Sequence, residues 1–98
     1  MTIDELRQSV SSATPPEGLT PAATALWYDA RGNWEEAHRI AQDVPDDEGG
    51  AWVHAYLHRK EGDEGNAAYL YRRAQQPVAR DSLADEWTRI ATALLADA

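Results

Sequence analysis

The stretch WVHAYLHRKEGDEGNAAYLYRRA, residues 52–74, predicts two helices joined by a tight turn. Gly62 is the residue type that most readily adopts the left-handed conformation at the end of a helix. Asp63, directly after it, is a preferred cap for the N-terminus of a second helix. We therefore expect one helix over about residues 50–61 and a second that starts at Asp63 and ends before Pro77.

The preceding segment has the same design. Thr20 followed by Pro21 is a typical helix start, and Gly32 ends that helix as Gly62 does. Asn33 then caps a further helix, because its side chain accepts hydrogen bonds from the free N–H groups of the first turn. The apolar side chains of that helix recur at helical spacing and form one stripe: Trp34, Ala37, Ala41 and Val44. Residues 45–50 follow as a turn.

Helices are also predicted at both ends of the chain. Residues 3–11 form a short amphipathic helix capped by Thr2, and the pattern leaves open whether it packs on the rest of the chain or extends as an arm. Residues 81–97 form a longer helix in which apolar residues recur every three or four positions: Leu83, Trp87, Ile90 and Leu94. No segment alternates in the manner of a β-strand. We therefore predict a single all-α domain, residues 1–98, of about six helices.

Aligning Gly32 with Gly62, which lie 30 residues apart, also aligns a capping residue and a small alanine. The aligned residues are Asn33 with Asp63 and Ala37 with Ala67. This pattern resembles the tetratricopeptide-like helical repeats over residues 20–77. The resemblance implies stacked helical hairpins and no particular activity. The period is 30 residues instead of about 34, and Glu64 stands where the first copy has the aromatic Trp34. Residues 54–63, HAYLHRKEGD, also resemble a family of small uncharacterised microbial proteins, which implies no mechanism.

Two hairpins fall short of the three or so repeats that usually close a helical-repeat core. We therefore expect the N-terminal helix and loop, residues 1–18, and the helix of residues 81–97 to cover the ends of the two hairpins. A homodimer, in which a second copy covers an exposed end, is the alternative.

The composition argues against several classes of function. A formal net charge of −8 opposes binding to duplex nucleic acid or anionic membranes, whose phosphates require a basic surface. The chain has no cysteine, so it lacks thiolate metal ligands and a cysteine nucleophile. Its carboxylates are expected to face solvent. No run approaches about 20 apolar residues, and the N-terminus lacks the features of a signal peptide. We expect a cytoplasmic protein and assign it no catalytic residues.

Basic residues concentrate in residues 52–80, which carry five Lys or Arg against three acids, whereas the rest of the chain is strongly acidic. Arginine offers a two-pronged fork for carboxylates, and aromatic rings stack on it. We therefore predict a protein or peptide interaction module, without a cofactor, that docks an acidic group of its partner on this hairpin. The predicted docking residues are Trp52, Tyr56, Arg59, Lys60, Tyr69, Arg72 and Arg73.

An alternative function comes from three side chains on one stripe of the helix over residues 50–61. His54, His58 and Glu61 lie at positions i, i+4 and i+7, so they project from the same side. Two imidazoles one turn apart can share a metal ion such as zinc, and a carboxylate one turn further on can add a third ligand. The stripe thus predicts a metal-binding enzyme or sensor. The alternative is that these three side chains form an ordinary polar face, which only hydrogen-bonds to a neighbouring helix. Whether His38 comes near depends on helix packing.

Overall fold

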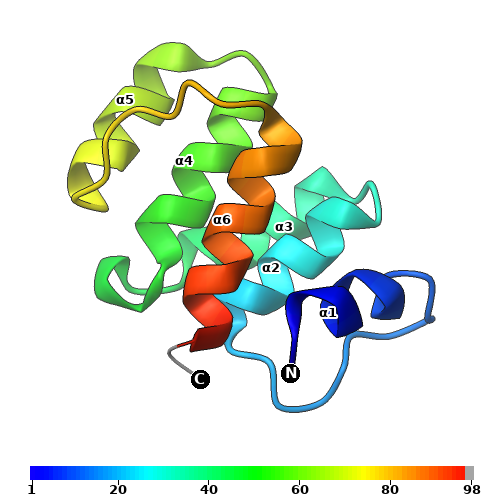
Figure 1. The fold of residues 1–98 in the computed structure, drawn as a ribbon. Coiled ribbons are helices and arrows are strands. Elements are labelled where there is room, and N and C mark those ends of the chain that lie inside the picture. The colour runs from blue at the N-terminus through cyan, green and yellow to red at the C-terminus, as the bar shows by residue number, and fades with distance from the viewer. Residues whose placement is uncertain (97–98) are drawn as a thin grey trace.

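The computed structural model describes residues 1–96 and contains six α-helices, with no β-strand in that range (Figure 1). The helices are α1 (Ile3–Ser9), α2 (Pro21–Ala30), α3 (Trp34–Gln42), α4 (Gly50–Lys60), α5 (Glu64–Arg73) and α6 (Leu83–Ala96), with a short 3₁₀ helix, η1 (Asp46–Glu48), before α4. The all-α prediction is confirmed. Helix α1 ends before the expected residue 11, and the predicted end of the last helix, Asp97, lies outside the described residues. None of these helices is both long enough and apolar enough to cross a membrane.

The predicted turns at Gly32 and Gly62 form where expected. Gly32 and Gly62 have positive φ angles of 83° and 89°. Directly after them, Asn33 and Asp63 donate their backbone N–H to a carbonyl of the preceding helix, both at 2.9 Å. The side chains of the same two residues accept from an N–H in the first turn of α3 and of α5, both at 3.2 Å. Each hairpin is thus closed by a left-handed glycine and a capping side chain.

Gly62 and Gly65 provide a matched test of the second turn. An added Cβ meets nothing within 4 Å at either position, so packing does not distinguish the two. Gly62→Ala places a side chain in the left-handed region and is expected to destabilise the fold by about 1–2 kcal/mol. Gly65→Ala, in the first turn of α5, is expected to stabilise it by about 0.5–1 kcal/mol, because alanine restricts the unfolded chain. Urea denaturation measures both changes, and equal values would contradict the left-handed turn.

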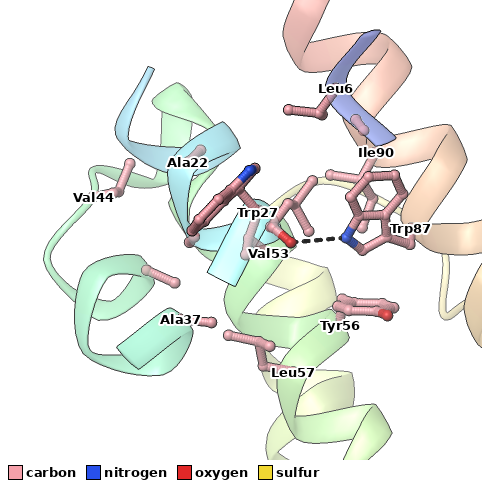
Figure 2. Close-up of a cluster of buried hydrophobic side chains, with 14 residues drawn as sticks. Leu6, Ala22, Trp27, Ala37, Val44, Val53, Tyr56, Leu57, Trp87 and Ile90 are labelled. Carbon is pink, nitrogen blue, oxygen red and sulfur yellow. Dashed lines mark hydrogen bonds between the residues drawn. The ribbon is translucent and has the colours of Figure 1, made fainter. Parts of the chain in front are cut away.

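Helix α6 lies across α2 and α4, and these three helices surround the main core (Figure 1). Trp87 of α6 packs into this core, where its indole N–H donates to the Leu26 carbonyl at 3.0 Å (Figure 2). Buried indole N–H groups usually have such a partner. Leu6 of α1 is fully buried in the same cluster, so the N-terminal helix packs on the rest of the chain. A second, smaller core lies between α4 and α5 and contains Ala55, Ala67, Leu70 and Tyr71.

Two acidic side chains are buried among residues 1–96, so the expectation that the carboxylates face solvent is wrong for these two. The first, Asp29 of α2, is 3% exposed. It accepts hydrogen bonds from the Tyr56 hydroxyl at 3.1 Å and the Lys60 ammonium at 2.9 Å, both on α4. Burial, followed by the Asp29 charge, raises the pKa of Tyr56, so its hydroxyl stays a donor. These contacts replace the water that the carboxylate loses on burial, and they join α2 to α4.

The second buried acid is Glu86 of α6, which is 0% exposed. Its two oxygens accept from the Arg59 guanidinium at 2.8 Å and the Tyr71 hydroxyl at 2.5 Å. Burial raises the pKa of the Tyr71 phenol, and the hydrogen bond to Glu86 raises the pKa of Arg59. The phenol therefore stays protonated and the guanidinium stays charged. This network joins α6 to both helices of the second hairpin.

Candidate metal centre

Three histidines from two helices converge on one point. His54 and His58 lie one turn apart on α4, and His38 reaches them from α3, which packs beside α4. The Nε2 atom of His54 lies 2.9 Å from Nε2 of His38 and 3.0 Å from Nε2 of His58. One nitrogen of each ring lies within 4.8 Å of the others. As a candidate site for a metal ion, His38, His54 and His58 are together called the metal centre below.

Hydrogen bonding alone does not account for these contacts. An imidazole nitrogen has one in-plane position, which holds either a proton or a lone pair. Nε2 of His54 can therefore make one good hydrogen bond, yet it has two nitrogen neighbours at bonding distance. At His58 the proton belongs on Nδ1, because Glu61 Oε1 lies 2.6 Å from that atom and a carboxylate can only accept. A neutral His58 then presents a lone pair at Nε2, toward His54.

A metal ion bound here would resolve this conflict, because it would accept a lone pair from each ring. Zinc–nitrogen bonds of about 2.0–2.1 Å place neighbouring ligand atoms about 3.3 Å apart in a tetrahedron and about 2.9 Å apart at right angles. The separations of 2.9 and 3.0 Å between the Nε2 atoms lie close to these values. Two of the three nitrogen–nitrogen separations therefore match those between neighbouring ligand atoms of one metal ion.

Two of the three imidazoles, those of His38 and His54, are also in the protonation state that metal ions require. Burial, and then the neighbouring His38 ring, lower the pKa of His54 to about 4. Burial is also the main cause that lowers the pKa of His38. Both rings are therefore neutral at neutral pH. Neutral imidazole is the form that donates a lone pair to a metal ion, so no proton has to be displaced from these two rings.

The geometry separates Glu61 from the point where the three histidines meet. His54 and His58 meet as expected, but Glu61 contacts His58 at Nδ1, on the opposite side of the ring from the other two histidines. A carboxylate in that position orients a metal-binding imidazole and makes it a stronger base. The third nitrogen comes from His38. Its ring stacks on Trp34 at a centroid distance of 4.9 Å, with 13° between the planes.

The predicted docking residues do not form one free basic surface. Arg59 and Lys60 are bound by the buried acids Glu86 and Asp29. Arg73 pairs with the Asp46 carboxylate, with two N–O distances of 2.8 and 3.0 Å. A partner's acidic group would have to compete with these carboxylates.

The remaining docking residues divide between the interior and the surface. Tyr56 is 3% exposed and belongs to the main core. Trp52 is partly buried, with the Arg89 guanidinium 5.9 Å from its ring. Tyr69 is 53% exposed, and Arg72 beside it is also exposed. The structure therefore places the seven residues in separate environments.

The chain matches no protein-family model, no curated protein and no solved structure. Its function is therefore inferred from its own side-chain chemistry.

Proposed function

We propose that this protein binds one divalent transition-metal ion through the Nε2 atoms of His38, His54 and His58. The observation that carries the proposal is the convergence of three imidazole nitrogens, two of their separations being 2.9 and 3.0 Å. Imidazole ligands suit zinc, copper and nickel, whereas magnesium and calcium prefer oxygen ligands. The ion would thus be zinc or a neighbouring transition metal.

The position of the metal centre supports a role in holding the fold together. His38 belongs to the first hairpin, α2 with α3, and the other two ligands belong to the second, α4 with α5. The two hairpins are linked along the chain only by residues 43–49. An ion held by both hairpins would bind the folded chain and not the unfolded one, so binding would stabilise the folded state. The protein would then respond to the availability of the metal, as a sensor or a metal-dependent enzyme does.

The test is a titration of chain purified without a histidine tag and stripped with a chelator. We expect isothermal calorimetry with Zn²⁺ to show one site per chain. His38→Ala is expected to lower the zinc affinity on the order of 100-fold or more. Loss of a group that only orients a ligand already lowers metal affinity by about 10–100-fold, and His38 is a ligand itself. Glu61→Gln, which keeps all three nitrogens, is expected to lower the zinc affinity by about 10–100-fold.

Glu35→Gln is the matched control, because Glu35 is exposed on the same helix as His38 and does not line the hollow beside His54. This variant should bind zinc as the natural chain does. Circular dichroism of each variant checks that the helices remain. Equal zinc affinity in His38→Ala and the natural chain, or the lack of a stoichiometric site, would refute the proposal.

A further inference from the structure

The metal centre supplies three ligands, and the described part of the chain supplies no fourth. In residues 1–96, the three histidine nitrogens form one group of potential ligands and His58, Glu61 and Asp63 form another. Glu61 and Asp63 face His58 at Nδ1, at 2.6 and 3.8 Å. The two nitrogens of an imidazole point in different directions, so these carboxylates cannot reach an ion bound to Nε2. Structural zinc sites normally have four protein ligands, whereas three-ligand sites bind water or an exogenous ligand in the fourth position.

A hollow borders one side of this centre. A hollow of about 420 Å³ lies beside His54 and is also lined by Asp46, Leu70 and Arg73. None of the three histidines is fully buried. A ligand that enters the hollow therefore lies between walls that include both His54 and the guanidinium of Arg73.

The charges around the hollow indicate which ligand would be bound. Without a metal ion, Arg73 is neutralised by Asp46, and the chain as a whole carries −8. A divalent ion at the histidines adds two positive charges beside this pair. The hollow then becomes a local site of positive potential in an acidic protein, and such a site attracts anions.

We propose that the ion at the metal centre keeps one open coordination position, reached through the hollow beside His54, that binds a small monodentate anion. This inference rests on the proposed metal binding and deepens it. A metal ion with an exchangeable position acts as a Lewis acid on the oxygen or nitrogen atom that it binds. The site would then be a reactive centre as well as a clamp between two hairpins.

The experiment uses Co²⁺, whose visible absorption responds to a change in its ligands. The stripped chain is loaded with one equivalent of Co²⁺, uptake is measured by elemental analysis, and sodium azide is then titrated. We expect the visible bands to shift in a saturable manner as azide enters the open position. A chain that holds one Co²⁺ but keeps an unchanged spectrum in excess azide would overturn the open position and leave metal binding intact. A chain that takes up no Co²⁺ would overturn both proposals.

A matched pair of arginines tests the route. Arg73→Gln removes the cation that lines the hollow and is expected to weaken azide binding by about two- to fivefold, the range for an exposed charge pair. Arg72→Gln removes an exposed neighbour on the same helix that does not line the hollow, so azide affinity should stay unchanged. Both variants keep the three histidines and should bind Co²⁺ normally. Equal azide affinities in the two variants would overturn entry through the hollow.

Discussion

Zinc is expected to raise the melting temperature of this chain by about 10–20 °C when its free concentration is 100 times the dissociation constant. Binding to the folded state alone contributes about 2.7 kcal/mol at that concentration. One kcal/mol shifts the melting temperature of a domain of this length by about 4–8 °C. The effect arises because His38 lies in one hairpin and its two partners lie in the other, so the complete site exists only in the folded chain. Differential scanning calorimetry with and without zinc measures the shift, and a chelator should reverse it.

Two controls separate this effect from general attraction of cations to an acidic protein. His38→Ala keeps the net charge of −8, counted with neutral histidine, and should lose most of the shift. Magnesium at the same concentration should leave the melting temperature of the natural chain unchanged, because Mg²⁺ prefers oxygen ligands and retains its water. A zinc shift of the same size in His38→Ala would place the ion elsewhere on the surface and contradict the metal centre.

The fold is predictable from the sequence where the signals are local. Gly32 and Gly62 each end a helix, and a capping residue follows each of them. These features act within a few residues, so no knowledge of the packing is needed. The position of α6 is different. Its apolar stripe indicates that one face is buried, but not that this face lies across α2 and α4 with Trp87 bonded to the Leu26 carbonyl.

In the candidate site, too, local features can be predicted from the sequence and contacts between helices cannot. His54 and His58 can be paired from the sequence because they share one helix. His38 lies on another helix, 16 residues before His54, and it joins them only because α3 packs beside α4. Helical spacing places Glu61 on the same stripe as His54 and His58 and so suggests a third ligand. Because Glu61 follows His58 by only three residues, its carboxylate contacts Nδ1 of that ring and not the point where the Nε2 atoms meet.

The interpretation of the basic residues depends on contacts of still longer range. Arg59 and Lys60 appear in the sequence as free cations near a turn. Their partners, Glu86 and Asp29, are 27 and 31 residues away along the chain. Nothing local indicates that those two acids are buried, because most acidic side chains are exposed. Two of the predicted docking residues, Arg59 and Lys60, are thus cations that the fold itself uses.

The Glu86 network gives the other large expected effect. Arg59→Ala is expected to destabilise the fold by about 3–5 kcal/mol, because it leaves the Glu86 carboxylate buried without a compensating cation. The hydrogen bond from the Tyr71 hydroxyl remains, but one neutral donor does not offset a buried charge. Loss of this magnitude is a large part of the total stability of a small domain. Urea denaturation followed by circular dichroism measures it.

Arg72→Ala is the control, since Arg72 is exposed on the second hairpin. This substitution should change the free energy of unfolding by less than about 0.5 kcal/mol. The double variant Arg59→Met with Glu86→Gln should recover most of the loss, because the amide is neutral and still accepts from Tyr71. A small loss in Arg59→Ala would show that Glu86 is not a buried anion. A large loss has a consequence for the docking prediction as well. An Arg59 variant that binds a partner poorly would then do so because it is unfolded. The docking prediction is therefore tested at exposed residues such as Arg72 and Tyr69.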